Sequence, residues 1–328
     1  MWLIRCSHFA LVRFDGMISR YPWERPRYLI LSHTWGAEEV AFSDMTNVEA
    51  AKRKKGWVKI EGICRVARGR NVDYAWVDTC CIDKSSSAEL TESINSMYAY
   101  YREAWVCIAF LEDLKPGEDL PTEEQLGRCR WFTRGWTLQE LIAPEKVWFY
   151  DTDWKFRCDT LEVLEAIQSI TNIDRRVLAL ERRPLDDISV AQKMSWAAGR
   201  TTTRIEDRAY SLLGIFGVNM PLIYGEGQGA FRRLQEAILQ QINDLSIFAW
   251  EEPSPSDVLC GVLAPRPEAF SGAGTIELMD DPNVPIPSFT VTNAAVEMST
   301  FLGIHYGGTS PMMVPETGDR LLHLRFRA

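Results

Sequence analysis

The sequence has few of the residues from which metal sites are built. It contains four histidines in 328 residues, and no two of its eight cysteines have the CxxC spacing of a zinc site. Several cysteines, such as Cys107, lie within apolar runs, where reduced thiols serve as small core residues. The sequence therefore predicts no metal site and a reducing, cytoplasmic location.

Long apolar runs and long basic runs are also missing. No stretch approaches the roughly 18 apolar residues of a membrane-spanning helix, and the first residues lack the apolar region of a signal peptide. The net charge is −9, and the densest basic cluster, Lys52 to Lys55, is too short for a phosphate-backbone surface. We therefore expect neither membrane nor nucleic acid as a partner.

The composition that remains is typical of a globular α/β protein. Apolar residues make up 46% and charged residues 25% of the chain. Apolar runs predict strands, and the helical spacing between them predicts helices at 57–70 and 88–104. Because strands and helices alternate, we expect parallel pairing in a doubly wound sheet. The predicted strands are 27–32, 74–82, 105–111 and 146–150.

The composition changes after residue 160. Helices are predicted near 161–170, 190–198, 207–216 and 230–243. From residue 252 the chain is rich in proline, glycine and serine, and two short apolar runs, 288–292 and 321–326, predict a small antiparallel sheet. The chain stops abruptly after the second run, as a fragment of a longer protein would. The expected parts are an extension (1–24), an α/β domain (25–150), a helical region that completes it (151–250) and a β-rich region (251–328).

Candidate site residues lie at the ends of the expected strands. Ser32 and His33 follow the first strand, Asp78 and Asp83 lie at the end of the second and just past it, and Glu140 lies in a short helix before the fourth. Strand ends of a parallel sheet share one crevice. A carboxylate there could stabilise a glycosyl cation or orient a ribose hydroxyl, and a histidine could transfer a proton.

Each candidate also has an ordinary structural alternative. The two aspartates could accept backbone hydrogen bonds in a turn, and His33 could be a structural hydrogen-bonding group. Glu140 could cap a helix or pair with an arginine such as Arg134. The glycine-rich segment 225–229 matches neither phosphate-loop spacing, which favours a turn at the start of a helix.

Three long blocks resemble the signatures of the fungal heterokaryon-incompatibility (HET) domain. They are Tyr28–Gly36, Ala75–Asp83 and Arg134–Pro144, in the order and at the spacing of that family. Asp207–Gly214 and Tyr224–Gly227 resemble the segment that often follows in HET proteins. The resemblance implies a fungal protein of non-self recognition, which triggers growth arrest or programmed cell death after incompatible hyphae fuse.

HET domains are distantly similar to Toll/interleukin-1 receptor (TIR) domains, which have a flavodoxin-like parallel sheet. Some TIR domains cleave NAD at its nicotinamide–ribose bond with a glutamate in a Trp-x-Leu-x-Glu-Leu-like segment. Trp136 to Leu141 is similar to this segment, with Thr137 where TIR domains often have cysteine. The resemblance implies that Glu140 is catalytic, with NAD as a substrate and no cofactor. The residues expected around the substrate are Ser32, His33, Trp35, Asp78, Asp83 and Trp136.

Three functional hypotheses follow from the resemblance. The first is a cell-death effector with latent NAD cleavage, switched on by self-association. The second is a non-catalytic signalling adaptor that binds other HET or TIR-like domains. The third is a pseudo-enzyme that binds a nucleotide without cleaving it. Lys84 stands where the family often has glutamine, in a loop that could shape the mouth of the site.

Overall fold

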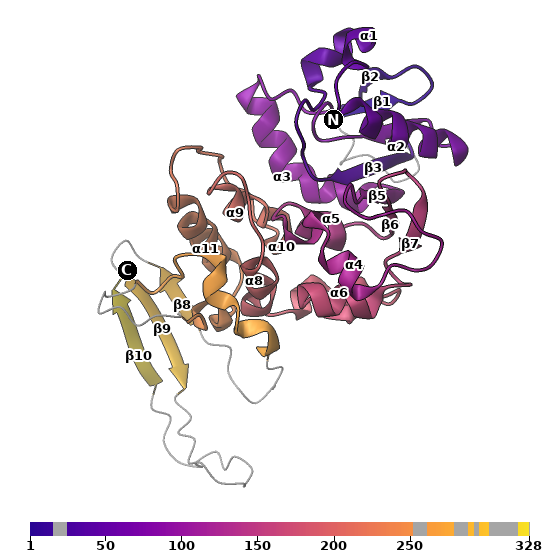
Figure 1. Cartoon of the computed structure of the whole chain (residues 1–328). Helices are drawn as coiled ribbons and strands as arrows, with labels where there is room; N and C mark the ends of the chain where they lie inside the picture. Colours follow the sequence, from indigo (N-terminus) through magenta and orange to yellow (C-terminus); the bar gives the residue numbers. More distant parts are fainter. Residues whose placement is uncertain (16–24, 252–260, 279–287, 292–294, 302–320, 328) are drawn as a thin grey trace.

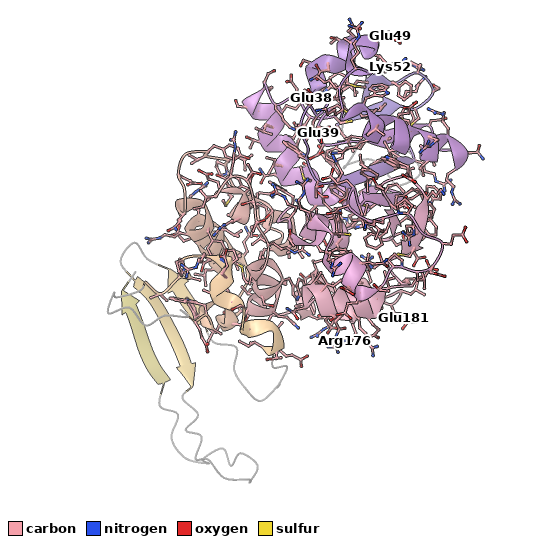
Figure 2. The ribbon with its side chains drawn as sticks, in the orientation of Figure 1. Glu38, Glu39, Glu49, Lys52, Arg176 and Glu181 are labelled. Carbon is pink, nitrogen blue, oxygen red and sulfur yellow. The ribbon has the colours of Figure 1, made fainter. Side chains whose placement is uncertain are left out.

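A seven-stranded sheet organises one part of the computed structural model, and a block of helices packs beside it (Figure 1). The structure describes residues 1–15, 25–251, 261–278, 288–291, 295–301 and 321–327. The strand order is β2-β1-β4-β3-β5-β6-β7. Charged side chains such as Glu49, Lys52 and Arg176 project from the periphery (Figure 2).

The four central strands are parallel, as the sequence predicts. They are β4 (Tyr74–Trp76), β3 (Tyr28–His33), β5 (Val106–Phe110) and β6 (Val147–Tyr150). Every side chain of β3 and β5 is buried, because helices or other segments cover both faces of the sheet. This burial is why β5 and the first four residues of β3 are apolar.

The edges of the sheet differ from the prediction of an all-parallel sheet. At one edge β1 (Trp2–Arg5) pairs antiparallel with both β4 and β2 (Ala10–Arg13). At the other edge β7 (Phe156–Asp159) pairs antiparallel with β6. The sheet is therefore mixed, and residues 2–13 of the expected N-terminal extension are part of it.

The second predicted strand, 74–82, is wrong beyond Trp76. The N–H groups of Cys80 and Cys81 both donate to the carbonyl of Val77, which forms a turn instead of a ladder. Val77 and Cys80 to Ile82 are nevertheless buried. An apolar run indicates that a segment is buried, but it does not by itself distinguish a strand from a buried turn.

The helices cover opposite faces of the sheet. On one face α2 (Trp57–Gly69) packs against β3 and β4. On the other face α5 (Thr137–Ile142) packs against β3 and against α3 (Ser87–Glu103), whose N-terminus is capped by Ser86. From β3 the chain crosses to β4 on one side and then to β5 on the other, so the topological switch point lies between β3 and β5.

Shorter helices fill the connections. Between β3 and β4 lie η2 (Phe42–Thr46) and α1 (Val48–Ala51), and between β5 and α5 lie α4 (Glu123–Gly127) and η3 (Arg130–Thr133). The last of these, η3, contacts α5 and lies next to the switch point.

The helical region is built around α8 (Val190–Ala198), whose residues from Val190 to Ala197 are all buried. The predicted helix 207–216 is two helices, α9 (Asp207–Tyr210) and α10 (Leu213–Phe216), and it ends at Gly217 with a left-handed φ of 65°. The other helices are α6 (Leu164–Thr171), α7 (Arg175–Leu178), η4 (Leu185–Asp187), α11 (Gly229–Gln241), η5 (Leu245–Phe248), η6 (Pro267–Phe270) and η7 (Ala273–Thr275).

The helical region and the sheet domain share a close contact. A Cβ atom added to Gly214 of α10 would lie 2.1 Å from the Cβ of Tyr98 on α3. Only glycine permits this approach of the two helices. The division of the chain at residue 150 remains a prediction.

The predicted small antiparallel sheet is present. Its order is β10-β9-β8, with β8 (Ser288–Val291), β9 (Ala295–Phe301) and β10 (Leu321–Arg327). The first and last of these strands lie at the two predicted apolar runs. Among the described residues, no helix is both long enough and apolar enough to cross a membrane.

Candidate functional site

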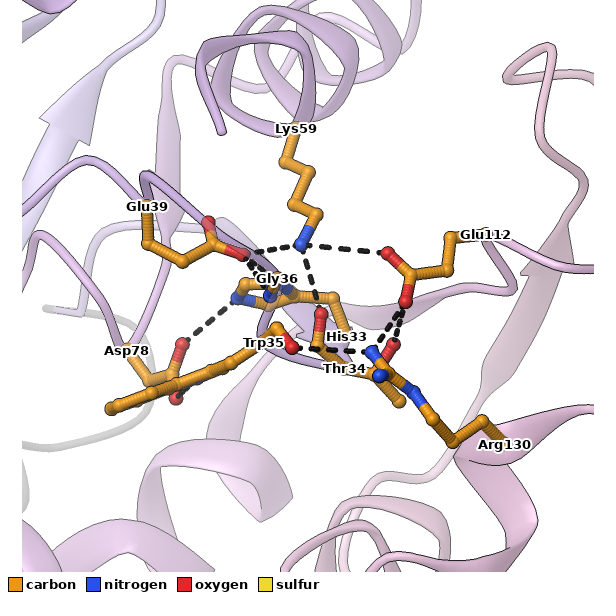
Figure 3. A network of polar contacts seen from close by, with 9 residues as sticks. All are labelled: His33, Thr34, Trp35, Gly36, Glu39, Lys59, Asp78, Glu112 and Arg130. Atoms are coloured by element: carbon orange, nitrogen blue, oxygen red, sulfur yellow. Dashed lines mark hydrogen bonds and ion pairs between the residues drawn. The ribbon is translucent and has the colours of Figure 1, made fainter. Parts of the chain in front are cut away.

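Polar side chains gather at the carboxyl ends of the central strands, at the switch point. Ser32 and His33 end β3, Asp78 follows β4, and Glu112 follows β5. Figure 3 shows the network that joins most of them. The expected convergence of strand-end side chains on one place is therefore observed for Ser32, His33 and Asp78, and Glu112 joins them.

A buried lysine holds this network together (Figure 3). Lys59 of α2 is 5% exposed, and its ammonium donates to the Thr34 carbonyl at 2.8 Å and to Glu39. It also lies 3.8 Å from one carboxylate oxygen of Glu112, whose other oxygen accepts hydrogen bonds from Thr34 and Arg130. A buried cation requires such partners because desolvation is costly. The lysine therefore ties the loops after β3 and β5 to α2.

Asp78 is enclosed by three side chains. His33 Nε2 lies 3.0 Å from one carboxylate oxygen, and the Trp35 indole donates to the other at 2.7 Å. The Lys84 ammonium lies 3.8 Å from the centre of the Trp35 ring, which is 51% exposed. Burial alone would raise the pKa of Asp78, but the hydrogen bond and charge of His33, together with Lys84 and Trp35, lower it. Asp78 is thus stabilised as a carboxylate, and it contacts the Trp35 ring against which Lys84 packs.

Glu140 lies in a second buried chain of hydrogen bonds. It is 5% exposed and accepts a hydrogen bond from Ser32, whose hydroxyl oxygen accepts from the Trp131 indole at 2.7 Å. The Tyr101 hydroxyl donates to the Leu31 carbonyl at 3.0 Å and also contacts Glu140. The hydrogen bond of Tyr101 to Glu140, like that of Ser32, lowers the pKa of the carboxyl.

The electrostatic surroundings agree with a neutral Glu140. Burial, followed by the negative charge of Asp78, raises its pKa to about 8, against the opposing effects of the hydrogen bonds from Ser32 and Tyr101 and of the Arg200 charge. A carboxyl with this pKa is mostly protonated near pH 7. An uncharged acid does not supply the negative charge that stabilises a glycosyl cation.

Arg200 lies near Glu140 without forming an ion pair with it. Among the described residues, Glu140 has no cationic side chain within ion-pair distance. Arg134, the partner considered from the sequence, donates instead to Thr203 at 3.0 Å. The buried Arg200 donates to the Arg134 carbonyl at 2.9 Å and to the Thr137 hydroxyl at 3.0 Å, which fixes the start of α5.

The structure brings together five of the seven predicted site residues. They are Ser32, His33, Trp35, Asp78 and Glu140. The other two point elsewhere. The Asp83 carboxylate accepts from the backbone and hydroxyl of Ser85 within its own loop, at 3.0 and 2.6 Å. Trp136 is half-buried and hydrogen-bonds to Asp207.

The sequence reasoning missed four residues that build the site, namely Lys59, Tyr101, Glu112 and Trp131. One signal was available for Lys59, because a lysine beside Ile60 and Ile63 on an apolar helix face must find buried partners. Tyr101 and Trp131 resemble ordinary core aromatics in the sequence. Only the fold brings the Tyr101 hydroxyl and the Trp131 indole into the hydrogen bonds around Ser32 and Glu140.

A cavity of about 10 Å³ lies beside Arg200, between Gly135, Thr202 and Ser211. This volume corresponds to about one water molecule. In the part of the chain that the structure describes, no group of three metal-ligating side chains is positioned to hold a metal ion.

The glycine-rich segment has a structural explanation. The N–H groups of Gly225 and Gly227 donate to the Glu206 carboxylate at 2.8 and 3.1 Å, with φ values of 105° and 60°. Successive N–H groups of this kind form an anion-binding concavity. Here the chain fills that concavity with its own carboxylate.

Comparison with known proteins identifies the segment that carries this site. The sequence model of the family described as "Heterokaryon incompatibility protein (HET)" matches residues 28–126. Residues 28–126 belong to the HET family. A domain of unknown function (DUF8212) matches residues 229–260. No solved structure matches the chain.

A curated relative extends the similarity beyond the HET match. "Vegetative incompatibility protein HET-E-1" of Podospora anserina is 45% identical over 221 residues, which cover 65% of this chain and 16% of that protein. The chain thus spans about one sixth of the length of this relative. The HET match includes Ser32, Lys59, Asp78 and Glu112 and ends before Glu140.

Proposed function

We propose that this HET domain protein acts in heterokaryon incompatibility as a non-catalytic, cytoplasmic signalling module. In this proposal it triggers programmed cell death by associating with other HET or TIR-like domains. The 45% identity to a vegetative incompatibility protein supports the biological role. Seven buried free cysteines, Cys6 to Cys158, suit a reducing compartment.

The main support for a non-catalytic role is that side chains of the protein itself occupy the crevice at the switch point. In related architectures a ligand occupies the crevice at the carboxyl ends of the strands. Here Trp131, which is 1% exposed, bonds to Ser32 there, and Arg130 bonds to the Trp35 carbonyl at 3.1 Å and to Glu112. The chain's own side chains occupy the crevice, which leaves its outer surface for recognition.

The test combines a cellular and a chemical measurement. Glu140→Gln replaces a neutral acid by a neutral amide of similar shape, so the buried chain of hydrogen bonds can be kept. We expect the variant to cause growth arrest in fungal cells as the wild type does, and neither protein to release nicotinamide from NAD at concentrations at which it associates. Nicotinamide release that Glu140→Gln abolishes would overturn the proposal.

A second candidate is NAD cleavage at the nicotinamide–ribose bond. It is favoured by the convergence of Ser32, Asp78 and Glu140, because raised carboxyl pKa values cluster at catalytic sites. The parallel order β4-β3-β5-β6 also corresponds to the first four strands of a flavodoxin-like 2-1-3-4-5 sheet. This order supports the TIR-like fold that the resemblance implies.

The second candidate requires the site to open. Glu140 would have to lose its proton, and η3 would have to move, before a nucleotide could enter. The bond between ribose and nicotinamide would then break, with its electron pair leaving on nicotinamide, and water would add to the ribosyl cation. Trp131→Ala removes the side chain that fills the crevice, so this candidate predicts more nicotinamide release from that variant than from the wild type. A thermal shift with NAD but without nicotinamide would support nucleotide binding alone.

A further inference from the structure

Edge strand β7 separates two exposed patches of opposite charge. Each patch combines one large exposed apolar side chain with two charged groups. Phe156 and Arg157 are neighbours on β7, so their side chains point to opposite faces of the sheet. Phe156 belongs to one patch, and Arg157 supports the other.

The basic patch consists of Phe156, Trp148, Arg65 and Arg70. Phe156 is 47% exposed, and its ring centre lies 6.0 Å from that of Trp148. The Arg70 guanidinium lies 4.8 Å over the Trp148 ring. Arg65 is exposed in the second half of α2 and Arg70 directly after its end, and neither pairs with a carboxylate in the described part of the chain. Both act on the pKa of the neighbouring Tyr150, which burial raises and their charges lower.

The acidic patch consists of Glu118, Asp119 and Leu120. All three are exposed, and Leu120 is 52% exposed. The buried Arg157 holds this loop in place, because its guanidinium donates to the carbonyls of Lys115 at 2.6 Å and Asp119 at 2.8 Å. Neither carboxylate has an ion-pair partner among the described residues. The loop therefore presents fixed, unpaired negative charge around an apolar side chain.

We infer that the acidic patch of one copy of this chain binds the basic patch of a second copy. The charges are complementary, with two unpaired carboxylates facing two unpaired guanidinium groups, and each patch supplies an apolar anchor. The two patches of one chain face away from each other, so they cannot satisfy one another within that chain. This inference rests on the proposed function, which is association with another domain, and it identifies that partner as a second copy of this chain.

The geometry also determines the type of assembly. The two patches differ, so the contact is heterologous, and every added copy leaves one patch of each kind free. Such a contact produces open chains or rings and does not stop at a symmetric dimer. Because the attraction is partly between surface charges, raising the salt concentration weakens it.

The test uses one neutral variant on each patch. Phe156→Ser removes the anchor of the basic patch, and Leu120→Ser removes that of the acidic patch. We expect the wild type to form species that grow beyond a dimer with concentration in sedimentation velocity, and each variant to raise the dissociation constant at least tenfold. A one-to-one mixture of the two variants keeps one intact contact, so it should form dimers and nothing larger.

A matched control comes from another exposed apolar side chain. Leu180 is 85% exposed and lies outside both patches, so Leu180→Ser should associate like the wild type. Circular dichroism and melting temperature confirm that all three variants remain folded. A wild type that stays monomeric at the highest soluble concentration overturns the inference. So does a mixture in which no dimer forms, which would indicate a symmetric contact or another surface.

The result of the association test can be distinguished from the result of the test of the proposed function. Association is measured on purified protein and needs no cell-death readout. If the chain associates as inferred but causes no growth arrest, the proposed function fails and this contact stands. If it causes arrest while Phe156→Ser and Leu120→Ser associate like the wild type, the contact is wrong and the function stands.

Discussion

Burial determines the protonation of Glu140 more than its hydrogen bonds do. Trp131 donates to Ser32, Ser32 donates to Glu140, and Tyr101 donates to the Leu31 carbonyl. The hydrogen bonds from Ser32 and Tyr101 favour the charged carboxylate, but burial and the negative charge of Asp78 outweigh them and raise the pKa. The same side chain would be charged at pH 7 if it were exposed.

The first prediction concerns the pH dependence of stability. The pKa of Glu140 is raised from 4.5 to about 8 in the folded protein. Between these values the folded state binds more protons than the unfolded state, so this group's stabilisation is complete below 4.5 and is lost as the pH rises through about 8. The slope is at most about 1.4 kcal/mol per pH unit.

Urea unfolding of the wild type and Glu140→Gln at several pH values measures this slope. The difference in unfolding free energy between them should change in favour of the variant as the pH rises from about 5 to about 8. Glu145 is exposed, so Glu145→Gln serves as the matched control and should follow the wild type. A constant difference across this range would show that Glu140 does not titrate there.

At the scale of elements, α5 depends on two arginines from the helical region. Arg200 binds its start through the Arg134 carbonyl and the Thr137 hydroxyl. Arg182 binds its end by donating to the carbonyls of Ile142, Pro144 and Glu145 at 2.9, 2.6 and 3.0 Å. A helix of six residues has little stability of its own. These two side chains therefore place the helix that carries Glu140.

The second prediction tests this support with Arg182→Lys. Lysine keeps the charge but loses the planar fork that reaches three carbonyls, so we expect a loss of about 1–3 kcal/mol in unfolding free energy. Hydrogen exchange should become faster in residues 137–145. Arg175 forms an exposed ion pair with Glu165, so Arg175→Lys should cost less than about 0.5 kcal/mol. Equal effects of the two substitutions would contradict a specific role for Arg182.

At the scale of the whole molecule, the HET match does not coincide with a folding unit. It ends at residue 126, yet β5 pairs with β6 through Cys107 and Val147. The helical region adds Arg182, Arg200 and the close contact of Gly214 with Tyr98. Removing these elements would expose buried apolar surface, which is the dominant source of stability.

The third prediction follows from this shared core. A chain of residues 1–150 should lack a cooperative thermal transition, because α5 loses its two arginines and β6 loses β7. A chain of residues 1–278 keeps the sheet and the elements packed on α8, so it should unfold cooperatively. Calorimetry and near-ultraviolet circular dichroism distinguish the two. A cooperative transition of the shorter chain would show that residues 25–150 fold independently.

The sequence predicted the sheet best where burial is complete. The strands β3, β5 and β6 were found because both of their faces are largely covered, which makes nearly all of their residues apolar. The edge strands β1, β2 and β7 were missed, because four residues at a half-exposed edge carry almost no pattern. The turn after Trp76 was mistaken for a strand because its residues are buried too.

The local pattern of the chain thus determined which segments are buried, the α/β class and the family. These follow from side-chain hydrophobicity and spacing, which each segment carries by itself. The tertiary structure alone decided that Ser32 and Glu140, separated by 108 positions, share a hydrogen bond, and that Asp83 and Trp136 do not join them. It also decided the charge state of Glu140, because desolvation and the field of Asp78 depend on distances in space that no segment of sequence contains.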